Sequence, residues 1–346
     1  LRNLLPQLIP GRDGRNTLLL EATLQRPWSI GVGGWITSTA NSMLYIDFGY
    51  HSLSFNSLDV NLSGWVGQSY LAGMASAKFS IRSAVPSFLR VEGVMSRQKF
   101  YDSQMLFYES PSPTFITEVD NFLRVSYERA FGKKARGFAR AGYGYMSDSY
   151  YPTNVTDYAR TSKDKTQYHI GVLQFGAESN MLNDNLYPNA GYEWRGVLSM
   201  SLESSRYTPQ GDKSLRGKYH GRGRIAAEGL WRKFFKVHRK FSLGVMANAM
   251  GTLQQLKQDY TATLIHAAAF APTPSTENYF NEAFRSDNYV AAGVIPVWNP
   301  IGKLQLRGDF YLYSPIRNLR ADGDRARYDG SVSYTHLRAH ETKANL

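Results

Sequence analysis

The chain has 346 residues, no cysteine, 14% aromatic residues and a formal net charge of +12. No stretch reaches the run of about 18 apolar residues that a membrane-spanning helix needs, which excludes an α-helical membrane protein. Lysine and arginine are scattered singly rather than gathered in a patch, so a nucleic-acid partner is not expected. The 23 tyrosines and the lack of cysteine fit a β-rich protein that folds in the periplasm.

Apolar and polar side chains alternate along the chain from about residue 28 onward. Leu44, Ile46 and Phe48, for example, share one face of a segment whose other face carries Asp47. Successive side chains of a strand point to opposite faces, so each such segment has one apolar and one polar face. In chain order, the pattern predicts strands at 28–37, 43–52, 57–67, 69–83, 87–101, 117–131, 134–148, 166–181, 190–205, 219–234, 240–255, 286–298 and 302–313. A fourteenth strand is predicted to begin near residue 326.

Connection lengths differ between the two ends of these strands. After even-numbered strands they are short, at 53–56, 84–86, 132–133, 182–189, 235–239 and 299–301. From the fifth strand onward, those after odd-numbered strands are long, at 102–116, 149–165, 206–218, 256–285 and 314–325. This segregation is typical of a transmembrane up-and-down barrel with periplasmic turns and extracellular loops, and not of a Greek-key sandwich. We therefore predict an all-β, transmembrane antiparallel β-barrel. A soluble all-β binding protein is the alternative that alternation alone leaves open.

We assign the predicted barrel to residues 27–331. The segments before and after it are not expected to belong to the native barrel. Residues 17–25 form a separate alternating segment preceded by a turn, so 1–26 are predicted to end a periplasmic domain or linker. Residues 332–346 match the translation of a transposon-type sequencing adapter, and we expect them to be an artefact without a function. His336 and His340, although spaced i, i+4, are therefore not assigned to a metal site. On this basis the native sequence stops inside the fourteenth strand, and a barrel closed by native strands is not expected.

Three features resemble one superfamily of outer-membrane barrels. The segment 183–192 is similar to a D-N-x-x-x-P-x-x-G turn, with its motif positions at Asp184, Asn185, Pro188 and Gly191. The longest loop, 256–285, falls between the eleventh and twelfth strands, and an apolar strand leads into 28–37 (WSIGVGGWIT). Together they resemble the BamA/TamA (bacterial surface antigen) superfamily. The resemblance implies about 16 strands in the outer membrane, with 1–26 as the end of a POTRA-like domain.

Within that superfamily, the stretch 270–293 looks most like the C-terminal barrels of patatin-like phospholipase proteins of Bacteroidetes-type bacteria. The resemblance implies a barrel that anchors such a protein and serves as its translocation unit. The family's Arg-Gly-Phe/Tyr motif in the lumen loop is not intact, because Arg285 is followed by Ser286. Arg285 is still the candidate lumen-loop residue.

Catalytic motifs are absent from the sequence. A patatin-type Ser–Asp dyad needs G-x-S-x-G and D-G-G/A, whereas Ser69 lacks the closing glycine and the segment 322–324 has the wrong third residue. His169, His220 and His238 are scattered without an evident serine partner, and we expect them in the lumen or in turns. No catalytic residue, cofactor or metal site is therefore predicted for this chain.

Charged residues on the predicted polar faces should point into the lumen, since charge facing lipid is costly. They are Arg90, Glu92, Arg124, Glu128, Glu193, Arg195, Glu203, Arg222, Arg224, Glu228, Arg307 and Asp309. We expect a salt-bridged interior that stiffens the barrel and seats the long loop; a selective, porin-like transport channel is the alternative. The expected partners are outer-membrane lipid or lipopolysaccharide and an upstream lipase or POTRA domain, and a homodimer is compatible with the sequence.

Overall fold

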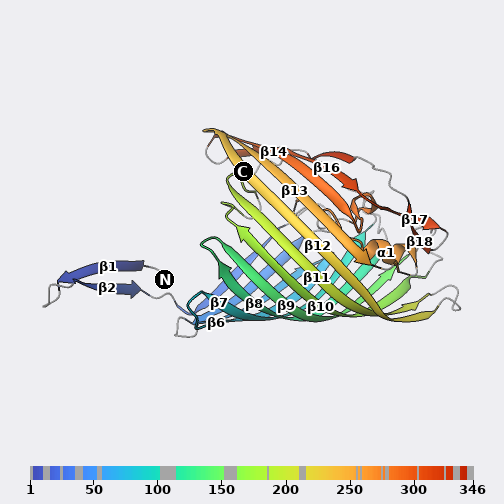
Figure 1. The fold of residues 1–346 in the computed structure, drawn as a ribbon, viewed down its shortest axis with the longest axis horizontal. Coiled ribbons are helices and arrows are strands. Elements are labelled where there is room, and N and C mark those ends of the chain that lie inside the picture. Colours follow the sequence, from blue (N-terminus) through green and yellow to red (C-terminus); the bar gives the residue numbers. More distant parts are fainter. Residues whose placement is uncertain are drawn as a thin grey trace.

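A computed structural model of the chain describes residues 3–10, 16–23, 26–35, 42–52, 57–101, 114–151, 162–184, 187–209, 216–254, 256–257, 259–273, 276, 280–301, 304–322, 325–329 and 336–340. Across these ranges the dominant feature is one 15-stranded antiparallel sheet. Within it, each strand from β3 to β14 pairs with the next in the chain, so the topology is up-and-down (Figure 1). The predicted all-β, up-and-down barrel wall is confirmed.

The strands of this sheet alternate in direction along the curved wall. They are β3 (Trp28–Trp35), β4 (Met43–Ser52), β5 (Leu58–Gly67), β6 (Tyr70–Ile81), β7 (Ser87–Tyr101), β8 (Thr114–Phe131), β9 (Ala135–Tyr150), β10 (Asp164–Asn180), β11 (Gly191–Thr208), β12 (Gly217–His238), β13 (Phe241–Gln254), β14 (Tyr289–Ile301), β15 (Leu304–Arg307), β16 (Asp309–Pro315) and β19 (His336–His340). We call the end that carries the turns 82–86, 132–134 and 239–240 the short-turn end, and the opposite end the long-loop end.

β15 and β16 together correspond to the single strand predicted at 302–313. Both pair with β14, and Leu306 and Arg307 of β15 keep the register of β16; the break between the two strands lies at Gly308, opposite Pro296. Proline has no N–H to donate, so the ladder is interrupted there. The remaining bond, from Gly308 N to the Pro296 carbonyl, measures 3.0 Å and keeps the two pieces aligned.

The prediction of a barrel strand beginning near residue 326 is wrong. Residues 325–329 form β18 (Arg325–Asp329), which pairs with β17 (Asn318–Asp322) in a separate hairpin, so its backbone groups are already satisfied locally. β16 instead pairs with β19, whose residues lie in the tail predicted to derive from an adapter. The sheet ends at β3 and at β19, and no pairing joins these two edges among the described residues.

The expected rule, short connections at one end of the sheet and long ones at the other, fails at the two ends of β11. β11 continues to Thr208 and β12 begins at Gly217, so their connection is shorter than the predicted loop 206–218. The turn from β10 to β11, at 181–190 on the short-turn end, is longer than the predicted 182–189. The longest connection, between β13 and β14, lies at the long-loop end as predicted. It contains α1 (Tyr260–His266) and the 3-10 helix η2 (Glu282–Phe284).

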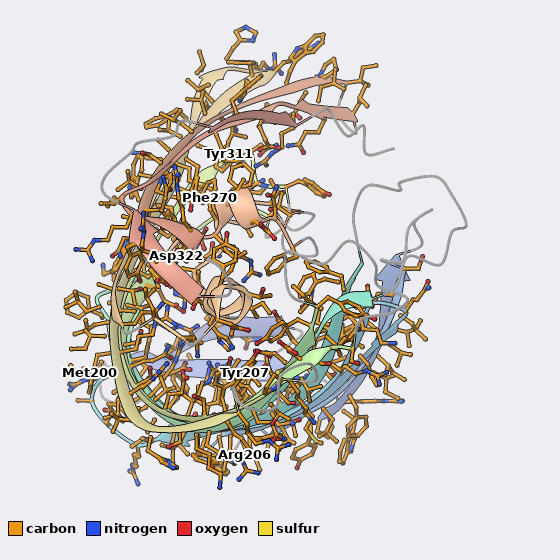
Figure 2. All side chains as sticks on the ribbon, turned by 90° about the vertical axis from the view of Figure 1, so that its right-hand side faces the viewer. Met200, Arg206, Tyr207, Phe270, Tyr311 and Asp322 are labelled. Atoms are coloured by element: carbon orange, nitrogen blue, oxygen red, sulfur yellow. The ribbon has the colours of Figure 1, made fainter. Side chains whose placement is uncertain are left out.

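The two faces of the sheet differ in chemistry as the alternation predicts. Figure 2 shows the wall curling around an interior, with Met200 pointing out and Tyr207, Phe270 and Tyr311 pointing in. Large apolar side chains stay exposed on the outer face, including Ile30 at 75% and Met200 at 43%. None of the helices within the described ranges has the length and apolar character needed to cross a membrane.

A hairpin of β1 (Asn3–Pro10) and β2 (Asn16–Thr23) forms its own two-stranded sheet ahead of β3. It lies beyond the short-turn end of the wall (Figure 1). β2 overlaps the separate strand predicted at 17–25. Its assignment to a POTRA-like domain stays a prediction.

Candidate functional site

The inner face of the sheet carries a chain of ion pairs with alternating sign. Each link joins neighbouring strands, and the members, in order from β7 to β12, are Arg90, Glu128, Arg136, Glu178, Arg195 and Glu228. The links to Glu128 measure 3.3 and 2.9 Å, and those on either side of Arg195 measure 4.0 Å. Glu128 is only 3% exposed. We call these six residues the inner charge chain.

The structure places every predicted lumen charge on the inner face, none of them fully exposed. Beyond the inner charge chain, Glu92 pairs with Arg124, and Arg307 Nε lies 3.0 Å from Asp309 Oδ1. The remaining predicted charges are Glu193, Glu203, Arg222 and Arg224. Their role in stiffening the barrel stays a prediction, since position alone does not measure it.

Several interior residues were missed at the sequence level. Arg136 and Glu178 supply two members of the inner charge chain, and Arg232 pairs with Glu193 at 2.7 Å. All three lie on polar faces of predicted strands or beside a turn, so extending the alternation to each strand end could have found them. Their partners, in contrast, depend on the register between strands, which alternation does not specify.

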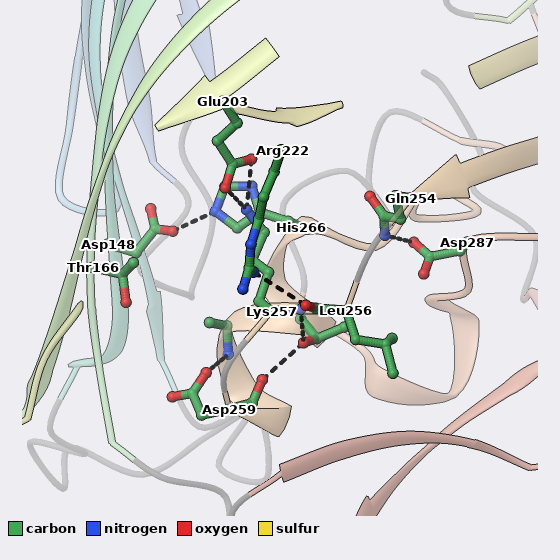
Figure 3. Close-up of polar contacts among 12 residues, drawn as sticks. Asp148, Thr166, Glu203, Arg222, Gln254, Leu256, Lys257, Asp259, His266 and Asp287 are labelled. Carbon is green, nitrogen blue, oxygen red and sulfur yellow. Dashed lines mark hydrogen bonds and ion pairs between the residues drawn. The ribbon is translucent and has the colours of Figure 1, made fainter. Parts of the chain in front are cut away.

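The loop between β13 and β14 lies inside the curved wall and is anchored at its first residues (Figure 3). Lys257 Nζ contacts both carboxylate oxygens of Glu203 on β11 at 2.8 Å. Arg222 on β12 donates to the Leu256 carbonyl at 3.1 Å. Burial lowers the pKa of Lys257, and the Glu203 carboxylate opposes that shift. Two strands thus hold the start of the loop by a charged pair and a charge-assisted hydrogen bond.

Helix α1 begins at Asp259, whose carboxylate accepts a hydrogen bond from Ala262 N at 2.8 Å as an N-cap. The same carboxylate accepts a second hydrogen bond from the Tyr150 hydroxyl of β9 at 2.7 Å. Burial raises the pKa of Asp259 to about 6, and these hydrogen bonds only partly oppose the shift. One side chain therefore both starts the helix and ties it to the wall.

Helix α1 ends at His266, whose Nε2 lies 2.7 Å from Asp148 Oδ2 on β9. Burial holds the pKa of His266 well below its usual value of 6.5, and the nearby Lys257 ammonium lowers it further. The imidazole is therefore neutral at pH 7, and its Nε2 shares a hydrogen bond with the Asp148 side chain. This bond attaches the second end of α1 to the same strand.

Docking of the loop should respond to pH through Asp259 and His266 in opposite directions. A raised carboxyl pKa contributes stability that is lost as pH rises through about 6, whereas a lowered histidine pKa contributes stability that is lost as pH falls below 6.5. In the Asp259→Asn variant only the His266 response remains, so the loop should dock less tightly as pH falls. In the His266→Gln variant only the Asp259 response remains, so the loop should dock more tightly as pH falls. Both variants carry Ala267→Cys, a unique thiol at a buried position. The alkylation rate of this thiol measures how often the loop leaves its docked position. Dividing it by the rate in the denatured protein at the same pH removes the pH dependence of the thiol itself. The same pH trend in both variants contradicts these assignments.

An aromatic cluster packs the other side of the loop against the opposite wall. Phe270 stacks on Tyr313 of β16 with ring centroids 5.5 Å apart, and contacts Tyr289 and Tyr311 edge-on at 5.9 Å. Phe284 lies 5.4 Å from the Tyr313 ring. The loop therefore contacts both β9–β12 and β14–β16, and it bridges the interior between them.

The side chain of Arg285 forms its hydrogen bonds within the loop and not with a charged residue of the sheet. Its guanidinium donates to the Ile265 carbonyl at 2.5 Å, near the end of α1, and its carbon lies 4.2 Å from the Phe280 ring centroid. A cation at the last carbonyls of a helix is favourable. Burial lowers its pKa, whereas the carboxylates of Glu118 and Asp148 act to raise it. Its wider part in docking the loop stays a prediction.

The family turn motif folds under the short-turn end of the interior. Gly191 has φ 97°, and an added Cβ would lie 2.1 Å from the Met181 carbonyl oxygen, so only glycine fits. Asp184 accepts from Tyr187 N at 2.8 Å, and Arg307 of β15 donates to the buried Pro188 carbonyl at 3.1 Å. The turn between β10 and β11 is thus linked to a distant strand. Asn185 lies outside the described residues.

The predicted placement of the histidines is wrong for two of them. His169 and His220 are both exposed on the outer face. His169 shares the strand parity of the outward Leu173, whereas His220 is turned outward by a β-bulge at Gly221, which has φ 72° and shifts the register between β11 and β12. His238 ends β12 beside a turn, as expected. Within the described ranges, no group of three or more acidic or histidine side chains is arranged to hold a metal ion.

The geometry defines an antiparallel up-and-down barrel wall with a loop-filled interior, and no family model or curated protein matches the chain. The crystal structure of BamA from Haemophilus ducreyi lacking POTRA domains 1–3 is 11% identical, with a TM-score of 0.42, over 98% of this chain and 75% of that chain. CdiB from Escherichia coli is 14% identical, with a TM-score of 0.47, over 97% of this chain and 60% of that chain. CdiB from Acinetobacter baumannii is 12% identical, with a TM-score of 0.40, over 94% and 57%. The chain thus spans less than two thirds of either CdiB chain, and similarities at this level assign no family.

Proposed function

We propose that the chain is an outer-membrane barrel that anchors a protein of the BamA/TamA-like superfamily and serves as its translocation unit. The observation that carries this proposal is the inverted arrangement of polarity. Exposed apolar side chains such as Ile30 and Met200 cover the outer face, while the inner charge chain lies inside. A soluble protein rarely exposes so extensive an apolar surface, whereas a lipid-facing barrel requires it.

The docked loop favours this role over an open transport channel. It bridges the interior from Lys257 near β11 to Phe270 at β16. A porin-like pathway needs a water-filled lumen, so conduction through this barrel would require the loop to leave. The channel is therefore the second candidate, and it depends on release of the loop.

The finer parts of the proposal rest on sequence resemblance alone. The link to patatin-like phospholipases depends on the stretch 270–293, and the upstream lipase or POTRA domain belongs to that same proposal. The proposed role gives this chain no catalytic residue and no cofactor. A homodimer stays a prediction.

A charge placed in the middle of the outer face tests the membrane location. Met200→Arg should lower the free energy of unfolding in lipid vesicles by about 2–4 kcal/mol, the cost of an arginine at the bilayer midplane. Met200→Leu is the matched control and should be nearly neutral. Urea titration of each variant in vesicles gives the comparison. In a soluble protein, a side chain that is already 43% exposed would accept arginine at little cost, so equal stability of the two variants contradicts the proposal.

A further inference from the structure

A group of basic side chains lies on the outer face at the long-loop end. Its members are exposed on three neighbouring strands and are Lys165, His169, Arg206, Lys218 and His220. We call them the cationic collar. Figure 2 shows Arg206 pointing away from the interior, whereas its neighbour Tyr207 points inward.

The strand register brings the collar together in two rows. Arg206 is the direct partner of both Gln167 on β10 and Lys218 on β12. In the adjacent row, Ser204 is opposite His169, and its Oγ lies 3.4 Å from His220 Nδ1. With Tyr145 these residues line a hollow of about 250 Å³.

The collar carries positive charge that the rest of the described structure does not neutralise. Neither Arg206 nor Lys218 forms an ion pair with a carboxylate among the described residues. On the inner face, in contrast, cations such as Arg136 and Lys257 each lie within 2.9 Å of a carboxylate. The collar therefore offers planar and point-charge donors suited to phosphate oxygens.

The collar also lies at the level where lipid headgroups are expected. Along β11, the outward residues after Ser204 are Leu202, Met200 and Leu198, and the series ends at Trp194, directly opposite Trp231. Ten residues at about 3.3 Å each, tilted by about 35–45° from the barrel axis, span about 25 Å, the height of the apolar band of such barrels. The collar and the tryptophan pair thus mark its two borders.

An apolar hollow of about 860 Å³ adjoins the collar on the same face. It extends over β4–β9 and shares Tyr145 with the cationic hollow. The wall is recessed there because small residues face each other across strands, Gly64 opposite Gly73 and Ala75 opposite Gly93. A phosphate-binding hollow joined to an apolar hollow fits a ligand that carries both phosphate and acyl chains.

We infer that the cationic collar binds the phosphate groups of a lipopolysaccharide-type glycolipid in the outer leaflet, with acyl chains lying in the adjoining apolar hollow. This inference rests on the proposed outer-membrane function and goes beyond it by naming the lipid and its site. Arg206 and Lys218 hold the phosphate oxygens. Gln167, His169 and His220 add hydrogen-bonding groups around them.

The test uses the full chain in detergent micelles with diphosphoryl lipid A as the probe. Because each surface cation contributes about 1 kcal/mol to binding anionic lipid, Arg206→Gln/Lys218→Gln should weaken retention about tenfold or more. The matched control is Lys133→Gln/Lys134→Gln, which removes the same charge from the exposed turn at the short-turn end. It should retain the probe like the unmodified chain. Dephosphorylated lipid A should bind the unmodified chain as weakly as diphosphoryl lipid A binds the collar variant.

Equal retention by the collar variant and the unmodified chain overturns the inference. Displacement of the probe by millimolar inorganic phosphate also overturns it, because the site would then recognise free phosphate. Flotation with phospholipid vesicles separates this inference from the proposed function. A chain that floats but does not select phosphorylated lipid A refutes only the collar site. A chain that does not float refutes both.

Discussion

Replacing Glu128 by glutamine is expected to lower the free energy of unfolding by about 3–5 kcal/mol, the usual cost of removing one partner of a buried ion pair. Glu128 is 3% exposed and lies between Arg90 and Arg136 in the inner charge chain. Glutamine keeps the size of the side chain but leaves Arg90 without its carboxylate. Urea titration in lipid vesicles measures the loss.

Asp59→Asn provides the control for that experiment. Asp59 also pairs with a basic side chain, His51, but the two side chains are 44% and 57% exposed. Solvent screens such a pair, and the expected change is below about 1 kcal/mol. If Glu128→Gln and Asp59→Asn lower the free energy of unfolding by similar amounts, burial does not strengthen the ion pairs of the inner charge chain.

The second large effect is expected at the anchor of the loop. Lys257→Met should release the loop, because it leaves the carboxylate of Glu203, 17% exposed, without its ammonium partner. It also removes a cation that lies 4.0 Å from the centroid of the Tyr168 ring. Alkylation of Ala267→Cys should then accelerate at least about tenfold, which corresponds to about 1.4 kcal/mol of docking free energy.

The double variant Lys257→Met/Glu203→Gln separates charge from packing. If the unpaired carboxylate causes the release, the second substitution restores most of the protection. An alkylation rate unchanged by Lys257→Met contradicts the anchor. Planar-bilayer current from the same proteins distinguishes the two candidate functions, since a channel should conduct when the loop is released and a purely anchoring barrel should not.

The faces of the strands could be predicted from the sequence because each is set by a local alternation. Leu44 and Ile46 face outward and Asp47 faces inward, since the period of a strand is two residues regardless of its neighbours. The same parity, applied to β10, would have placed His169 outside. On β12 it would have placed His220 inside with Arg222, and only the bulge at Gly221, which alternation does not reveal, turns His220 outward. His169 was expected inside because polar residues were assigned to the lumen without applying the alternation of its own strand.

Features that depend on partners distant in sequence could not be predicted. Glu178 contacts Arg136 and lies near Arg195 only because the registers of β9, β10 and β11 bring them together. The hairpin of β17 and β18 was missed because its segment could equally have paired with β16. Helix α1 was local, however, and Asp259 before an apolar segment is a recognisable N-cap signal.

The inner charge chain also affects how accurately the sheet can assemble. If one strand slipped by a single residue against its neighbour, its charged side chains would move from the interior to the apolar outer face. A slip of two residues that places Glu178 opposite Phe138 instead of Arg136 would keep its charge inside without a cation directly opposite. The ion pairs across the seams from β7 to β12 therefore favour the native register over such misaligned states. In addition to any stability that they give the finished wall, we expect them to select the correct alignment of neighbouring strands as the sheet forms.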